Sequence, residues 1–259
     1  MKIIYTGHSG FIVETKDQIL LFDCIARGKG QDPAPEEAGV SCGILPDFDP
    51  AKKISVFISH SHGDHYAARI WKLAQDHENV EYFLGNDISR DRVIRDRAAV
   101  CGQDQGRAKI FFAQPDMTYL SEGMKVETLL STDAGVAFYV TLKNGKTIFH
   151  AGDLLLWLWD ENTPDENRFF KDTFYGELKR IAGRGTDIAF LPFDPRLEDK
   201  AALSIDEYLK ALDVGFALPM HFWKRYDLVK RYVDSSRDLP FRSPVWALER
   251  ENQEFIIED

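Results

Sequence analysis

The sequence has few cysteines, and their spacing suggests no structural role. Cys24, Cys42 and Cys101 are an odd number in 259 residues, and no two of them form a C-x-x-C pair. Neither a disulfide framework nor a thiolate zinc site is therefore expected. A reducing compartment, the cytoplasm, fits this cysteine usage best.

Basic side chains and long apolar runs are also scarce. Lysine and arginine number 32 against 42 acidic residues, which gives a formal net charge of -10. This charge opposes docking on nucleic acid or on anionic lipid. No window approaches the roughly 20 apolar residues of a membrane span, and the first eight residues lack an apolar run of signal-peptide length. We expect neither a nucleic-acid partner nor a membrane segment.

What the chain does contain is a series of short β-rich runs, followed by alternating strands and helices. Expected strands are Lys2–Thr6, Phe11–Glu14, Gln18–Asp23, Ile54–Ser59, Val80–Leu84, Ala108–Ala113, Val126–Ser131, Val136–Leu142, Thr147–His150, Asp187–Leu191, Phe216–Pro219 and Glu254–Glu258. Expected helices are Ala67–Gln75, Asp87–Val100, Phe169–Ile181, Ser204–Leu212 and Tyr226–Val233. This order predicts an α/β fold, an αββα sandwich of two mixed β-sheets flanked by helices, in a single domain of residues 1–259.

A histidine cluster follows one of these strands directly. It reads His60-Ser61-His62-Gly63-Asp64-His65 and holds three of the seven histidines in the chain. His60 and His62 are two residues apart, so in extended backbone both rings project to the same side and can chelate one cation. A solvated turn that is rich in histidine by chance is a poor alternative to a metal site.

Three further candidate ligands stand where apolar strands end. They are Asp133 in Ser131–Val136, Asp153 after Gly152, and His221 after Met220. Strand ends of a rigid sheet are where α/β proteins usually assemble their sites. For Asp133 and Asp153, each taken alone, a turn or a helix cap is an equally good interpretation.

Together these residues resemble a known family. The run His60–His65 matches the H-x-H-x-D-H motif of the metallo-β-lactamase superfamily, Gly152-Asp153 resembles its metal-bridging aspartate, and Met220-His221 resembles its last histidine. The opening residues Tyr5–Phe11 and Leu20–Asp23 are similar to the branch that contains ascorbate-6-phosphate lactonase. The resemblance implies the metallo-β-lactamase fold, but it is not specific for a substrate.

The resemblance also implies two divalent metal ions. It places His60, His62 and Asp153 on the first ion and Asp64, His65, Asp153 and His221 on the second, so that Asp153 bridges them. The family usually supplies one more histidine to the first ion, and in this chain Asp133 stands in that place. Zinc is the first expectation, and manganese or iron are alternatives because a carboxylate suits them relatively well.

Such a centre implies hydrolysis by a hydroxide held between the two ions, and no serine nucleophile is needed. The expected substrate is a small molecule with an ester, lactone, amide or phosphodiester bond. Asp64 is the candidate catalytic residue, which orients the hydroxide, accepts its proton or only coordinates. Two alternatives remain open: a nuclease or phosphodiesterase, and a metal-binding module without catalysis, which Asp133 makes credible.

Four residues are weaker candidates for binding the substrate. His8 precedes the second strand, Trp157 and Trp223 each follow a proposed ligand closely, and Lys224 comes directly after Trp223. Indole rings wall apolar pockets, and a lysine binds a phosphate or carboxylate. The alternatives are a histidine held in a hairpin turn, tryptophans packed in the core and a solvated lysine.

Overall fold

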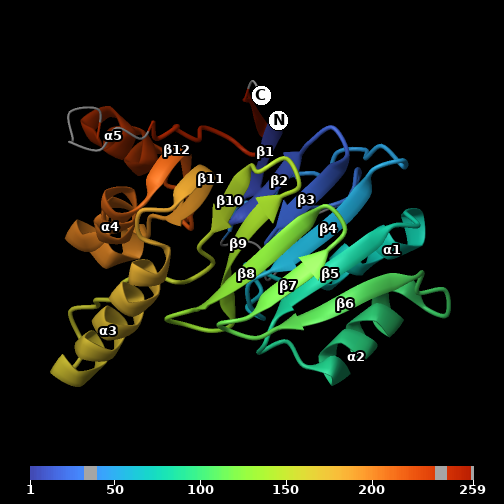
Figure 1. The fold of residues 1–259 in the computed structure, drawn as a ribbon, viewed down its shortest axis with the longest axis horizontal. Helices are drawn as coiled ribbons and strands as arrows, with labels where there is room; N and C mark the ends of the chain where they lie inside the picture. The colour runs from blue at the N-terminus through green and yellow to red at the C-terminus, as the bar shows by residue number, and fades with distance from the viewer. Residues whose placement is uncertain (32–39, 237–243, 258–259) are drawn as a thin grey trace. The chain divides into compact units, whose positions relative to one another are not determined.

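The computed structural model describes residues 1–31, 40–236 and 244–257 of the chain. These residues form two compact units, Met1–Ala113 with Arg250–Asp259, and Gln114–Glu249. Each unit contains one mixed β-sheet with helices packed against it (Figure 1). The expected fold class, two mixed sheets flanked by helices, is therefore confirmed.

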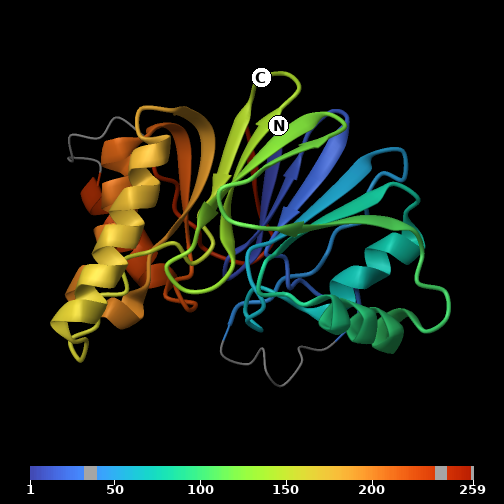
Figure 2. The same cartoon turned by 60° about the horizontal axis from the view of Figure 1, so that its bottom comes forward.

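The sheet of the first unit has seven strands in the order β13-β1-β2-β3-β4-β5-β6. Their bounds are β1 Lys2–Gly7, β2 Gly10–Glu14, β3 Gln18–Phe22, β4 Lys53–Ile58, β5 Val80–Gly85, β6 Ala108–Ala113 and β13 Gln253–Ile256. Strands β3 to β6 are parallel, and the others pair antiparallel. A 3₁₀ helix at Ala68–Lys72, α1 (Leu73–Asp76) and α2 (Arg90–Cys101) cover one face with buried apolar side chains (Figure 2).

The other face of this sheet carries a row of aromatic rings in register. Tyr5, Phe11, Phe22, Phe57 and Phe83 are opposite one another on five neighbouring strands, and each is fully buried. The rings of Phe22 and Phe57 stack 4.7 Å apart, and those of Phe57 and Phe83 stack 4.9 Å apart. Because successive residues of a strand point to opposite faces, a shift of one residue would turn every ring to the helix side.

The sheet of the second unit has six strands in the order β12-β11-β10-β9-β8-β7. Their bounds are β7 Thr118–Ser121, β8 Met124–Leu130, β9 Val136–Leu142, β10 Thr147–His150, β11 Gly185–Pro192 and β12 Asp213–Met220. Strands β10, β11 and β12 are parallel neighbours, so their carboxyl ends meet at one edge. The helices are α3 (Pro164–Ile181), α4 (Leu203–Ala211), which packs on β11 and β12, and α5 (Tyr226–Ser236).

Most elements agree with those expected from the sequence to within three residues, and a 3₁₀ helix at Pro195–Lys200 was not expected. The short edge strand β7 was not expected, because its polar ends hide the strand pattern. Helix α3 begins five residues earlier than expected, at Pro164, because Thr163 and Glu166 form a capping box there. The last strand ends at Ile256, and Glu258 lies outside the described residues.

Two further expectations concern the chain as a whole. Within the described residues, no helix combines the length and the apolar character that a membrane crossing requires. The expectation of one domain over residues 1–259 stays a prediction.

Candidate metal centre

The histidine-rich loop of the first unit is held by two hydrogen bonds to the backbone of Ser61. The amide of Ser61 donates to Asp87 Oδ2 at 2.8 Å, and the carbonyl of Ser61 accepts from Arg92 Nη1 at 2.8 Å. A turn follows, in which the amide of His65 donates to the carbonyl of His62 at 3.1 Å. Both Asp87 and Arg92 come from the segment that begins α2, so this helix fixes the loop between its first two histidines.

Two histidines of the loop lie with ring nitrogens close together. His60 Nε2 lies 3.0 Å from His62 Nδ1, and His60 Nδ1 lies 2.9 Å from Ser59 Oγ. Burial holds the pKa of His60 well below its ordinary value, and the neighbouring His65 contributes the next largest effect in the same direction. His60 is therefore neutral at physiological pH, which is the state in which an imidazole binds a metal. Nitrogen ligands of one tetrahedral zinc are roughly 3.3 Å apart, close to the spacing seen here.

His65 is oriented by a buried carboxylate. Its Nδ1 lies 2.7 Å from Asp23 Oδ2, and Asp23 in turn accepts from the amide and the hydroxyl of Ser59 at 2.7 and 2.6 Å. A carboxylate at Nδ1 fixes the ring and leaves Nε2 available to a cation. That Nε2 lies 3.8 Å from Asp64 Oδ2. The set Asp23, His65 and Asp64 thus has the arrangement of a metal ligand with its supporting carboxylate.

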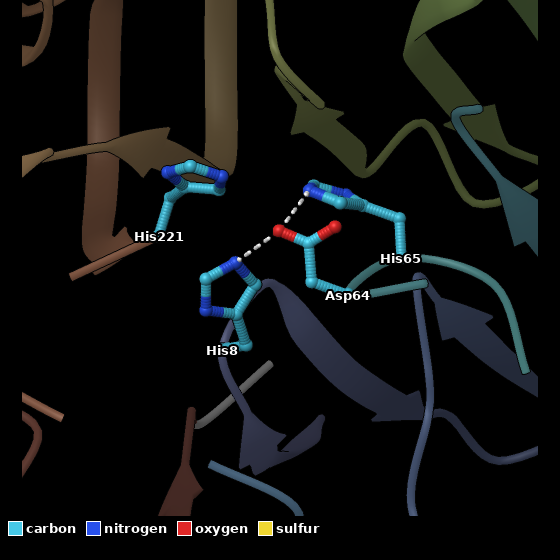
Figure 3. Close-up of side chains that lie close together, drawn as sticks. All are labelled: His8, Asp64, His65 and His221. Atoms are coloured by element: carbon cyan, nitrogen blue, oxygen red, sulfur yellow. Dashed lines mark hydrogen bonds and ion pairs between the residues drawn. The ribbon is translucent and has the colours of Figure 1, made fainter. Parts of the chain in front are cut away.

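His8 joins this set from the first hairpin. Its Nε2 lies 3.0 Å from Asp64 Oδ2, and Figure 3 shows the two side chains pointing toward each other. Ligand atoms of His8, Asp64 and His65 lie within 4.8 Å of one another. The tight turn before His8 needs glycine: Gly7 has a φ of +112°, and a Cβ there would lie 2.5 Å from the carbonyl oxygen of Ser41.

The second unit brings three side chains together at the carboxyl ends of β10, β11 and β12. Asp153 follows β10, Asp194 follows β11 and His221 follows β12. His221 Nδ1 lies 3.1 Å from Asp194 Oδ2, and His221 Nε2 lies 3.5 Å from Asp153 Oδ2. This repeats the arrangement of the first unit: one carboxylate at Nδ1 and a second on the Nε2 side.

Asp194 is itself held by an arginine. Arg196 donates from Nε to both carboxylate oxygens at 3.0 and 3.1 Å and from Nη2 to Oδ2 at 2.6 Å. Burial alone would raise the pKa of Asp194, but hydrogen bonds from His221 and Arg196 outweigh it and bring the pKa well below its ordinary range. Asp194 is therefore ionised and can orient the His221 ring.

Three tryptophans surround this ion pair. The Arg196 guanidinium lies 4.4 Å from the ring centroid of Trp223, 5.6 Å from that of Trp159 and 5.7 Å from that of Trp157. Trp157 and Trp223 also approach the His221 ring edge-on, with centroids 6.0 and 5.6 Å apart. The expectation that Trp157 and Trp223 line a substrate pocket stays a prediction, but both lie beside His221.

The loop that contains Asp133 is tied to the loop that contains Asp153. Thr132 Oγ1 donates to the carbonyls of Asp153 and Leu155 at 3.0 and 2.6 Å. Asp133 is exposed, and its amide donates to Ser131 Oγ at 3.2 Å. Asp133 is thus carried on a loop fixed to that of Asp153, and its role as a ligand stays a prediction.

Several of these residues have a backbone conformation that non-glycine residues rarely adopt. The φ angles are 49° for His8, 39° for Asp23 and 61° for His221. Each such conformation costs on the order of 1–3 kcal/mol, and such residues cluster at functional sites. Lys224 also has a positive φ, of 60°, and is exposed.

Four residues of these sets were not recognised in the sequence. They are Asp23, Ser59, Asp194 and Arg196, and none belongs to the histidine motif; Asp23 and Asp194 support histidines that are distant in sequence. Two of them carry the same signal as the ligands that were found: Asp23 and Asp194 follow the ends of β3 and β11. A strand-end rule applied to every acidic residue would have included them.

The two mixed sheets, with histidines and aspartates gathered beyond the strand ends, define a class of protein. The chain has the metallo-β-lactamase fold. Its donor set, made of imidazoles and carboxylates with supporting carboxylates at Nδ1, fits divalent cations such as zinc, manganese or iron. No protein-family model matches the chain.

The chain is similar in sequence or in fold to several known proteins. The chain is 26% identical to a UPF0173 metal-dependent hydrolase of Bacillus cereus (strain AH820) over 230 residues, 86% of each chain. Igni18, a metallo hydrolase from Ignicoccus hospitalis, has the same fold, with a TM-score of 0.59 and 17% identity over 99% of both chains. CmlA, a diiron beta-hydroxylase from Streptomyces venezuelae, gives a TM-score of 0.61 and 12% identity over 99% of this chain and 54% of its own.

These likenesses confirm the metallo-β-lactamase fold that the sequence predicted, and they show that the chain is similar to proteins named metal-dependent hydrolases. The finer resemblance to the branch of ascorbate-6-phosphate lactonase stays a prediction.

Proposed function

We propose that this protein uses divalent metal ions to hydrolyse an ester, lactone, amide or phosphodiester bond of a small molecule. The observation that carries the proposal is the pair of supported histidines. His65 and His221 each have a buried carboxylate at Nδ1, and the Nε2 atom of each faces a second carboxylate. Cores that need only packing rarely place buried imidazoles between two acidic groups, whereas metal sites do so regularly.

The residues proposed as metal ligands are those that the resemblance implies: His60, His62, Asp64, His65, Asp133, Asp153 and His221, with Asp153 shared between two ions. When bound, the ions would supply an electrophile for the scissile group and a water molecule activated as hydroxide. Such chemistry requires ligands that are neutral imidazoles and ionised carboxylates.

Asp64 is the proposed catalytic residue. Its side chain is 21% exposed, so it is open to solvent, and Oδ2 is within hydrogen-bonding distance of His8. His8 is fully buried on its side chain. A hydrogen bond from the His8 ring would keep the Asp64 carboxylate in one orientation, in which it coordinates or accepts a proton from the attacking water.

Zinc is the first candidate metal, and manganese or iron are the alternatives. The exposed carboxylate of Asp133, in the place where the family usually has a histidine, favours harder ions. The superfamily fold is also used by CmlA, which is described as diiron. We further propose a small-molecule substrate, no nucleic-acid partner and a cytoplasmic location, on the grounds of charge and cysteine usage.

Metal analysis joined to turnover tests the proposal. Purified protein would be analysed for zinc, manganese and iron and assayed on a panel of esters, lactones, amides and phosphodiesters. His65→Ala should lose metal and turnover, while the control His77→Ala, which changes a histidine at the end of α1, should keep both. Metal binding without turnover on any substrate would instead favour the non-catalytic module, and turnover of phosphodiesters alone would favour the phosphodiesterase.

A further inference from the structure

One end of the Arg196 guanidinium remains available. A guanidinium has five N–H donors in a planar fork. Asp194 occupies the side of the fork made by Nε and one N–H of Nη2. Among the residues that the structure describes, none accepts a hydrogen bond from Nη1, and the side chain is 42% exposed. Arg196 can therefore hold Asp194 and still offer its Nη1–Nη2 end to another acceptor.

The tryptophans fix the direction of that free end. Trp223, Trp159 and Trp157 lie within 5.7 Å of the guanidinium carbon, and Trp157 and Trp159 are stacked on each other at 5.9 Å. Contacts of this kind hold the fork in one plane. A hydrogen bond from such a charged donor is stronger than one between neutral groups.

We propose that Arg196 is a specificity-determining residue, and that its Nη1–Nη2 end binds an anionic group, a carboxylate or a phosphate, on an otherwise flat apolar substrate. The half-buried Trp159 and Trp223 would contact the apolar part. This inference rests on the proposed function and names the substrate class for it. Because Asp194 joins Arg196 to His221 through 2.6 and 3.1 Å contacts, the anionic group would bind at a fixed position relative to that ligand.

Binding of small probes to the metal-loaded protein tests this inference without turnover. Benzoate and phenyl phosphate are the anionic probes, and benzamide is the neutral probe of the same shape. Calorimetry should show tighter binding of at least one anionic probe than of benzamide. Arg196→Gln should weaken the anionic probes by about tenfold or more and leave benzamide unchanged. Whether benzoate or phenyl phosphate binds better assigns the group.

The chain offers a matched control. Arg184 also pairs with a carboxylate, Glu127 at 2.8 Å, and lies 3.7 Å from the ring centroid of Tyr139. It precedes β11, whereas Asp194 follows the same strand, so the two arginines are at opposite ends. Arg184→Gln should leave the affinity for every probe unchanged.

Loss of Arg196 also deprives Asp194 of its cation, so metal content must be measured for each variant. Arg196→Lys keeps the charge and removes the planar fork; it should retain the metal content and bind anionic probes with intermediate affinity. Equal affinity for anionic and neutral probes in the unaltered protein, or unchanged affinity in both Arg196 variants, would overturn the inference. If the protein turns over substrates but shows no preference for anionic probes, only the anion-binding role of Arg196 is contradicted. If anionic probes bind through Arg196 but no substrate is turned over, only the proposed hydrolase function is contradicted.

Discussion

The two units support a histidine in the same manner but with different partners. In the first unit Asp23 receives hydrogen bonds from the amide and hydroxyl of Ser59, which are neutral donors inside the core. In the second unit Asp194 is paired with Arg196, a cation whose side chain is 42% exposed. The carboxylate of Asp23 is therefore closed to solvent, whereas that of Asp194 is connected to solvent through the arginine.

The units also differ in how their residues are distributed along the chain. Four candidate ligands of the first unit lie within residues 60–65, on one loop after β4. In the second unit, Asp153 and His221 come from separate loops and are brought together by the pairing of β10, β11 and β12. A local motif therefore reveals the first set, and only tertiary structure reveals the second.

The largest effect is expected for Asp153, because the proposal makes it a ligand of two ions. Asp153→Ala should reduce the metal content by both equivalents, whereas Asp133→Ala should cost one at most. Plasma emission analysis of the purified variants gives the stoichiometry. If Asp153→Ala loses a single equivalent, the carboxylate does not bridge.

A substitution at Gly7 tests how strongly the backbone turn before His8 is constrained. Gly7→Ala should destabilise the metal-free protein by about 2 kcal/mol or more, since the new Cβ meets a backbone oxygen and the positive φ disfavours alanine. Gly145→Ala is the control: its φ is +85°, but a Cβ there meets nothing within 4 Å. Urea unfolding measures both. Equal losses in the two variants would mean that the contact with Ser41 is not a constraint.

The supporting carboxylates allow a direct test of the comparison. Asp23→Asn and Asp194→Asn preserve shape and remove the charge, so each should weaken metal binding about 10- to 100-fold. Competition with a chromogenic chelator measures the affinity. An effect confined to one of the two variants would show that only that unit holds metal through its histidine.

The smallest effect is expected far from either set. Thr163→Ala removes the capping box of α3 and should cost about 1 kcal/mol of stability in the second unit, with metal affinity unchanged. Thermal unfolding and the same chelator competition separate the two quantities. A parallel loss of metal affinity would show that the site depends on the stability of the whole unit, and the comparison between local supports would then lose its basis.

Most of the fold could be predicted from the sequence because its strands are apolar runs with clear turn signals. The short strand β7 could not, since its alternation covers only four residues and two of them are exposed. The histidine loop was evident from spacing alone. Asp194 and Arg196 were not, because a carboxylate that supports a distant histidine looks, in the sequence, like any aspartate at the start of a turn.

The pairing of β1 with β13 has a consequence for synthesis. Lys2 is opposite Ile256 and Tyr5 is opposite Gln253, so β1 is completed by a strand that follows the second unit in the sequence. On the ribosome the whole of the second unit is made in between. Until residues 253–256 emerge, the outer edge of β1 lacks this partner, and such an edge is a template for pairing with another chain. We therefore expect the nascent chain to depend on chaperones until residues 253–256 have emerged.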